Sequence, residues 1–284
     1  MSMDANGIIN NLAAKAEKNL TIRENDFKDE NGFWVCGICG KPKQIYLEQF
    51  KRVVVCACDC DIAKMEEENR RQKQQEEMEV VRTFENVSLL TKKYRNATFE
   101  NYEKRKTNEN NFKLCYHYAK DFDDMLAKGQ RLLLWGDVGT GKTYAAACIV
   151  NYLLDRGIPA VMTSLIKLVD QIQYGYEKET DIINRLKRVK LLVLDDLGAE
   201  RGTDYSLERA YSILDARVSS ELPLITTTNR TIEEMLNETD MRYKRIYERA
   251  YDKAYQIQFT GVSWRKAEAG KMYEEMEKIL KKNE

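Results

Sequence analysis

Residues 136–143 read Gly-Asp-Val-Gly-Thr-Gly-Lys-Thr, and this stretch decides the fold. It fits the pattern G-x-x-x-x-G-K-[ST] without a mismatch. An apolar run at residues 132–135 precedes it, and a helical pattern follows at residues 144–154. A strand, a glycine-rich loop and a helix in this order turn backbone N–H groups and the positive end of the helix toward an anion. The stretch therefore predicts a triphosphate site, because a chance glycine-rich turn would lack these flanking elements.

Every residue of this loop is a candidate contact for ATP. The candidates are Gly136, Asp137, Val138, Gly139, Thr140, Gly141, Lys142 and Thr143. We expect the Lys142 ammonium to reach the β- and γ-phosphates and the Thr143 hydroxyl to bind Mg²⁺.

Two adjacent acids supply the other half of the predicted site. Asp195 and Asp196 follow four apolar residues, 191–194. Asp195 is the candidate for holding Mg²⁺ through water, and Asp196 is the candidate for polarising the attacking water. An aspartate at the second position is shorter than a glutamate, which predicts slow hydrolysis. After the next apolar run, Asn229 is expected to hydrogen-bond the attacking water or the γ-phosphate; the alternative is an Asx turn that ends a strand.

Short apolar and β-branched runs alternate with helical patterns in the C-terminal part of the chain. We expect strands at residues 131–135, 158–163, 190–195, 224–228 and 255–259. This alternation predicts an α/β fold with a five-stranded parallel sheet and helices on both faces. The loop, the two acids and Asn229 are then expected at the same edge of the sheet.

Composition divides the chain into three parts. We expect a cysteine-containing N-terminal module at residues 1–60, a charged helical connector at 61–100 and the ATPase domain at 101–284. The N-terminus is polar and lacks the apolar core of a signal peptide, and no stretch has the roughly 18 apolar residues of a membrane span, so we expect a cytoplasmic location. Lys plus Arg equals Asp plus Glu at 46 each, so net charge gives no general attraction to nucleic acid.

Five of the seven cysteines gather in the N-terminal part. Cys36 and Cys39 form a C-x-x-C knuckle, and Cys56, Cys58 and Cys60 follow after a gap of sixteen residues. Zinc takes four tetrahedral sulfur or nitrogen ligands, and disulfides are rare in the cytosol, so the pattern predicts a Cys₄ zinc site. On the assumption that residues 56–60 form a strand, we favour Cys56 and Cys58 as the second pair over Cys58 and Cys60. Unliganded thiols and a redox motif are the competing interpretations.

Taken together, the motifs resemble those of the DnaC/DnaI-type replicative helicase loaders, AAA+ ATPases to which the IstB transposition ATPases are close relatives. The resemblance spans roughly residues 83–270. It is carried by residues 94–99, the loop at 136–143, and residues 191–201, 223–229, 245–249 and 263–265. The Asp-Asp-Leu-Gly-Ala-Glu stretch followed by Thr-Thr-Asn is more selective than the phosphate loop, which many families share.

The resemblance assigns roles that spacing alone does not, because Arg242, Arg245, Arg249 and Arg265 are equally plausible from the sequence. It implies that Arg249 is an arginine finger reaching a neighbouring subunit's ATP and that Arg265 contacts the γ-phosphate within its own subunit. It implies self-association through the ATPase domain and assembly with a DnaB-type replicative helicase hexamer on single-stranded DNA. A zinc module that contacts the helicase is also found in loaders of the DnaI kind.

The family binds single-stranded DNA along the helix after the second strand, which corresponds here to residues 164–176. Lys167 would then contact a phosphate, and Tyr174 and Tyr176 would offer stacking faces. The alternative is a helix that packs on the core with tyrosines at its end. We therefore expect an ATP-dependent helicase loader. The competing functions are an IstB-like transposition helper and a nucleotide-switched adaptor with negligible turnover.

Overall fold

The computed structural model describes residues 20–104 and 108–281, so expectations for residues 1–19 lie outside the described residues. The chain folds as two compact units, Met1–Lys73 and Gln74–Glu284, and the boundary falls within helix α2 (Asp59–Arg82). In the part of the chain that the structure describes, no helix is long and apolar enough to cross a membrane.

The first unit consists of two small antiparallel ribbons and the start of α2. Its elements are β1 (Phe27–Lys28), β2 (Trp34–Val35), β3 (Gln44–Leu47), the 3₁₀ helix η2 (Glu48–Phe50) and β4 (Arg52–Val55). β1 pairs with β2, and β3 pairs with β4. The buried apolar side chains among its described residues are Cys36, Val53 and Cys58. Since so small a core stabilises little, this unit needs another source of stability, such as a metal.

The second unit contains a five-stranded parallel sheet in the order β6-β7-β8-β5-β9. Its elements are η3 (Glu85–Val87), α3 (Lys92–Arg95), α4 (Glu109–Lys120), α5 (Phe122–Ala127), β5 (Arg131–Gly136), α6 (Lys142–Leu154), β6 (Ala160–Thr163), α7 (Leu165–Gln173), α8 (Glu179–Leu186), β7 (Leu191–Leu197), α9 (Asp204–Ser219), β8 (Leu224–Thr228), α10 (Ile232–Leu236), α11 (Met241–Tyr251), β9 (Ala254–Phe259) and α12 (Trp264–Leu280). The predicted α/β fold and parallel sheet are confirmed.

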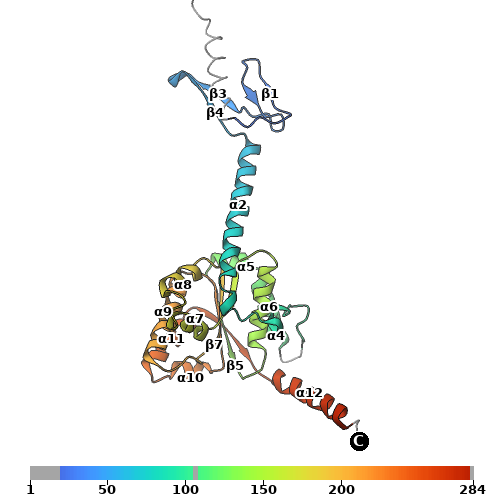
Figure 1. Ribbon diagram of the computed structural model, residues 1–284, viewed down its shortest axis with the longest axis vertical. Coiled ribbons are helices and arrows are strands. Elements are labelled where there is room, and N and C mark those ends of the chain that lie inside the picture. The colour runs from blue at the N-terminus through green and yellow to red at the C-terminus, as the bar shows by residue number, and fades with distance from the viewer. Residues whose placement is uncertain (1–19, 105–107, 282–284) are drawn as a thin grey trace, which may run out of the picture. The chain divides into compact units, whose positions relative to one another are not determined.

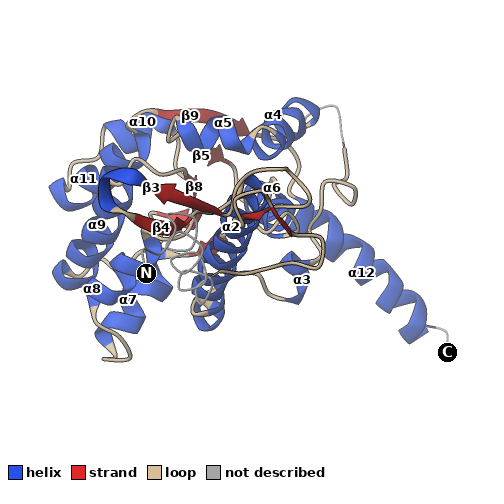
Figure 2. Cartoon of the chain, turned by 90° about the horizontal axis from the view of Figure 1, so that it is seen from above, coloured by secondary structure: helices blue, strands red, loops and turns tan. Residues whose placement is uncertain are grey.

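Helices cover both faces of this sheet (Figure 1). Successive side chains of a strand point to opposite faces, and β5 shows this clearly. Leu132 and Leu134 pack with residues of α4 and α6, whereas Leu133 packs with residues of α7, α8, α9 and α11. Both faces of β5 are therefore buried, which explains why its sequence is a continuous apolar run. The last helix, α12, leads away from the sheet in both views (Figures 1 and 2), and none of its residues is buried.

The segment expected to be a connector, residues 61–100, differs from that expectation in its second half. Val80, in the last turn of α2, and Phe84, just after the helix, are buried together with Val87 in the core on one side of the sheet. Ala97 and Phe99 are buried in the core on the other side. In the structure the second unit thus begins at Gln74, upstream of residue 101.

A buried arginine stabilises the end of the sheet that lies opposite the phosphate loop, where the strands begin. Arg217, on α9, is 1% exposed, and burial lowers its pKa to about 9. Its guanidinium donates to the carbonyl oxygens of Leu186, Val189, Lys190 and Pro223 at 2.6–3.0 Å. These carbonyls lie just before β7 and β8, so one side chain ties the entries of two strands together.

Replacing Arg217 with Met should lower the free energy of unfolding by about 3 kcal/mol or more, because it leaves buried carbonyls without donors. Urea unfolding of the full chain followed by circular dichroism measures this. Arg188→Met, which removes an exposed arginine nearby, is the matched control. Equal unfolding midpoints for the two variants would contradict the role of Arg217.

Candidate nucleotide and metal sites

The phosphate loop connects β5 to α6 and depends on its glycines. Gly136 and Gly139 have φ of 124° and 81°. A Cβ on Gly136 would lie 2.2 Å from the carbonyl oxygen of Phe259, and one on Gly139 would lie 2.2 Å from the Ser263 Oγ. The loop is therefore packed against the end of β9 and the turn that follows it, with no room for side chains at these two positions.

Lys142 opens α6 and is buried beneath the loop. Its Nζ donates to the carbonyl oxygens of Gly136 at 2.8 Å and of Asp137 at 2.7 Å. Burial lowers the pKa of this ammonium, and the nearby carboxylates of Asp196, Asp137 and Asp195 oppose that change.

The acidic pair lies on an irregularity of β7. The register with β8 shifts between Leu194 and Leu197, so β7 carries one extra residue there, a β-bulge. Asp196 has φ of 60° in the left-handed region, which aspartate tolerates better than most residues. In a regular strand two adjacent side chains would point to opposite faces. The bulge explains how Asp195 and Asp196 both line the same cavity.

Asp195 is held by two hydroxyl groups. The Thr227 Oγ1 donates to its Oδ1 at 2.6 Å, and the Thr143 Oγ1 donates to the same oxygen at 2.9 Å. Burial raises the pKa of Asp195, and both hydroxyl groups act in the opposite direction. A carboxylate beside a threonine hydroxyl is a donor set that Mg²⁺ accepts, so these residues fit the predicted metal.

Asn229 lies where the sheet order requires. β8 runs between β5 and β7, so the residue that follows β8 lies between the phosphate loop and the acidic pair. The Asn229 Nδ2 donates to the Oδ1 of Asp196 at 2.7 Å. The structure thus brings the sequence-predicted residues of the loop, the acidic pair and Asn229 to one edge of the sheet.

A cavity of about 270 Å³ joins these groups to residues that sequence analysis missed. Its additional lining residues are Lys93, Tyr94, Asn101, Tyr102, Glu103, Asn108, Tyr144, Thr227, Trp264 and Glu268. Tyr144 was detectable as the residue directly after Thr143. Thr227 lies on β8, and Tyr94 and Trp264 belong to the motifs at residues 94–99 and 263–265. The others come from segments before β5 or after β9, and no motif connects them to the phosphate loop. Tyr102 and Tyr144 lie side by side with ring centroids 5.8 Å apart, so one wall of the cavity is aromatic.

The arginines separate into two environments. Arg265 lines the cavity, because the backbone N–H of Trp264 donates to the Gly139 carbonyl at 2.9 Å and holds the start of α12 on the loop. Arg249 is not among the described residues that line this cavity. It lies on α11, with its Nε 2.8 Å from the Asp215 Oδ1.

The helix considered for DNA contacts combines features of both interpretations. Ser164 caps it, and Leu168 and Val169 are buried in the core. The Lys167 Nζ donates to the Ser88 carbonyl at 3.0 Å, so this ammonium is engaged within the chain. Tyr174 and Tyr176 are 59% and 73% exposed. The tyrosines, but not Lys167, are available to a ligand.

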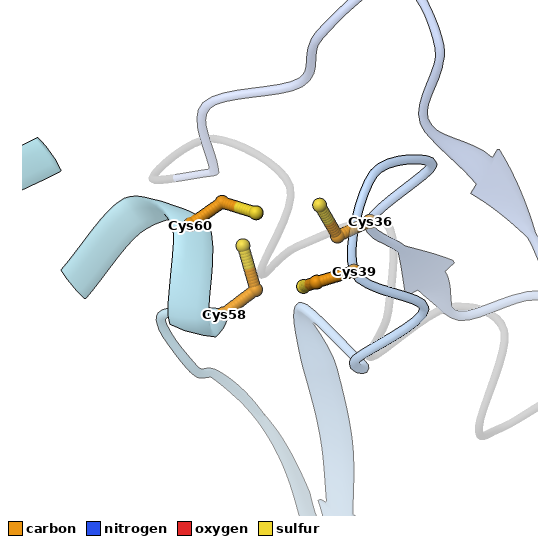
Figure 3. A group of neighbouring side chains, drawn as sticks. All are labelled: Cys36, Cys39, Cys58 and Cys60. Atoms are coloured by element: carbon orange, nitrogen blue, oxygen red, sulfur yellow. The ribbon is translucent and has the colours of Figure 1, made fainter. Parts of the chain in front are cut away.

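Four cysteines of the first unit converge (Figure 3). Cys36 and Cys39 lie on the knuckle after β2, and Cys58 and Cys60 lie at the start of α2. Their Sγ atoms are all within 4.8 Å of one another. Tetrahedral zinc with Zn–S bonds of about 2.3 Å holds sulfurs about 3.8 Å apart, so this group fits a structural zinc ion.

The preference for Cys56 over Cys60 as a ligand is corrected by this arrangement. It assumed a strand through residues 56–60, but β4 ends at Val55 and α2 starts at Asp59. The change from strand to helix directs Cys58 and Cys60 to the same point. The Cys56 Sγ lies outside the group and donates to the Pro42 carbonyl at 3.1 Å.

The fold and the nucleotide site define a AAA+ ATPase. The chain belongs to the family described as IstB-like ATP binding proteins, which matches residues 59–271. It is 30% identical over 202 residues to the replicative helicase loader DnaC of Escherichia coli strain K12, covering 69% of this chain and 80% of that protein. It is 27% identical over 121 residues to the replicative helicase loader DnaI of Bacillus subtilis strain 168, covering 42% of this chain and 39% of that protein.

A solved structure shares the fold. The crystal structure of the DnaC helicase loader superposes with a TM-score of 0.51 at 22% identity, covering 60% of this chain and 100% of that chain. The family match begins at Asp59, after the Cys36–Cys39 knuckle. The nucleotide site therefore lies within the family match, and most of the cysteine module lies upstream of it.

Exchanging single cysteines tests the corrected ligand set. Cys60→Ser should lower zinc affinity at least tenfold, because one of four thiolates is lost, whereas Cys56→Ser should retain the affinity of the unaltered chain. Zinc content after dialysis against a chelator, measured by atomic absorption, separates the two. The reverse order would restore Cys56 as the ligand.

Proposed function

We propose that this chain is a cytoplasmic, ATP-dependent loader that binds a DnaB-type hexameric helicase and assists its placement on single-stranded DNA. The observation that carries this proposal is the similarity to a replicative helicase loader over 80% of that protein's length. A match over 202 residues extends far beyond the eight residues of the phosphate loop.

ATP binding is assigned to the cavity beside the phosphate loop. In this proposal Lys142 binds the β- and γ-phosphates, and Thr143 with Asp195 holds Mg²⁺, which neutralises charge on the phosphates. The short bonds from Thr143 and Thr227 to Asp195 support the assignment, since they fix the orientation of the carboxylate. The aromatic wall formed by Tyr102 and Tyr144 is suited to the base.

Hydrolysis is assigned to residues on both sides of a subunit interface. Asp196 orients the attacking water together with Asn229, and their 2.7 Å hydrogen bond supports a joint role. Arg265 contacts the γ-phosphate from the same chain. Arg249 acts on the nucleotide of a neighbouring copy, and its position outside its own cavity supports action between subunits. Such a head-to-tail contact allows ATP to control self-association.

The first unit is assigned to the helicase. It carries the candidate zinc group, and Phe27, Ile38 and Phe50 expose 52%, 66% and 64% of their surface. Exposed apolar residues on a small module are typical of a partner-binding surface. For single-stranded DNA we propose contacts through Tyr174 and Tyr176, whose exposed rings offer stacking faces.

Two other functions compete with this proposal. The IstB-like family description favours a transposition helper, which would act with a transposase instead of a helicase. Asp196 in place of a longer glutamate favours an adaptor that binds ATP as a switch with negligible turnover. ATP turnover with and without single-stranded DNA distinguishes the switch from the loader.

The loader proposal predicts co-elution with the host's hexameric replicative helicase in size-exclusion chromatography. We expect a stable complex in the presence of ATP and Mg²⁺. Lys142→Ala, which removes the phosphate-binding ammonium, should lose ATP binding and shows whether the complex depends on nucleotide. Failure to co-elute under any nucleotide condition would favour the transposition helper.

The proposed role of Arg249 predicts catalysis between subunits. Arg249→Ala should bind ATP normally but lose cooperative turnover, and Asp196→Asn should also bind ATP without hydrolysis. Mixing the two should restore up to about one quarter of wild-type turnover, since in a random mixture that share of head-to-tail contacts pairs an intact site with an intact finger. Arg242→Ala, about two turns away on the same helix, is the control. No recovery in the mixture would contradict the role of Arg249 between subunits.

A further inference from the structure

A buried ionic network lies beside the cysteine group and has no part in the nucleotide site. The Lys43 Nζ is 2.7 Å from the Asp26 Oδ2 and 3.5 Å from the Asp61 Oδ2, and it donates to the Thr21 carbonyl at 2.6 Å. Lys43 and Asp26 side chains are 1% and 0% exposed. Arg23 forms a second ion pair with Asp61. A lysine this deeply buried in a unit with almost no apolar core requires a specific reason, because burying its charge is costly.

Each aspartate of the network contacts a different half of the cysteine group. Asp26 accepts the backbone N–H of Gly37 at 3.2 Å, within the knuckle that carries Cys36 and Cys39. Asp61 lies 3.2 Å from the Cys58 Sγ, at the start of α2. Lys43 contacts both aspartates and therefore connects the two halves.

The segment that contains Arg23 and Asp26 is packed tightly on the knuckle. A Cβ on Gly37 would lie only 1.7 Å from the carbonyl oxygen of Asn25, so the two backbones touch. The Asp26 Oδ2 also accepts the backbone N–H of Arg23 at 2.8 Å, which closes residues 23–26 into a turn. This turn contains no cysteine, yet it covers the knuckle and is held in place by Lys43.

The charges of the network complement a thiolate–metal site. Four thiolates outweigh the two positive charges of a zinc ion, and the two nearby aspartates add further negative charge. Lys43 and Arg23 balance those aspartates. Residues that orient metal ligands from behind commonly change metal affinity by 10–100-fold when they are removed.

We propose that Lys43 is a positioning residue of the zinc site, and that residues 21–26 are an integral part of the metal module. The inference rests on the proposed zinc site. Lys43 holds the covering turn, the knuckle and the start of α2 in the arrangement in which the four thiols converge. Removing its ammonium leaves Asp26 buried without its cation and frees the two cysteine pairs to move apart.

The test measures zinc affinity of the full chain by competition with a chromophoric chelator. Lys43→Met should weaken zinc binding by about 10–100-fold and broaden or shift the visible spectrum of the cobalt-substituted protein. Lys41→Met is the matched control: it removes the ammonium of an exposed lysine, 60% exposed and paired with Asp59 at the surface, and should leave both readouts unchanged.

A second variant tests whether Lys43→Met weakens zinc binding only because it destabilises the fold of the module. Asp26→Asn combined with Lys43→Met removes both buried charges and should recover part of the lost zinc affinity, because no buried carboxylate is then left unpaired. Wild-type affinity in Lys43→Met, or no recovery in the double variant, would overturn the inference while leaving the zinc site intact. A wild-type chain that binds neither zinc nor cobalt would instead overturn the zinc site itself and the inference with it.

Discussion

The Asp195 carboxylate accepts hydrogen bonds that connect two strands and one helix of the ATPase unit. It stands on β7, Thr227 reaches it from β8, and Thr143 reaches it from the start of α6. Thr227 is almost completely buried, and its Oγ1 also accepts the backbone N–H of Asp196 at 2.9 Å. Without the Asp195 carboxylate, the O–H of Thr227 would lack an acceptor, at a cost of about 1–3 kcal/mol. The interaction that orients a metal ligand also holds three segments of the fold together. The position of the Asp195 carboxylate in the nucleotide site is therefore fixed by the strands and by the start of α6, and does not depend on a loose loop.

The remaining walls of the site come from segments far apart in the sequence. Tyr102 precedes the sheet, Gly136 rests on Phe259 of the last strand, and Trp264 is hydrogen-bonded to Gly139. The lining of this cavity therefore combines residues from the beginning, middle and end of the unit. Binding energy gained there stabilises the folded unit as a whole, by an amount that grows with nucleotide concentration.

Much of this organisation could be predicted from the sequence, and the exceptions have physical causes. The phosphate loop, the five strands and the polar residues at their ends follow from local patterns that the sheet preserves. The bulge that lets Asp196 share a cavity with its neighbour is set by pairing with β8, which no local pattern reports. Cys60 was not preferred because a change from strand to helix determines where the thiols point. Lys43 was overlooked because lysine is almost always exposed, and Tyr102 because only the folded chain brings it to the loop.

The position of β9 has a consequence for synthesis on the ribosome. β5, which carries the phosphate loop, lies between β8 and β9, and the loop is pressed against the end of β9. A nascent chain that has emerged only as far as Asn229, just after β8, already contains the phosphate loop and both acids. It still lacks one neighbour of β5 and the support under Gly136. At elongation rates of about 5–20 residues per second, the unfinished domain exposes an open strand edge until its last strand emerges. The nucleotide site is therefore among the last features of the unit to form.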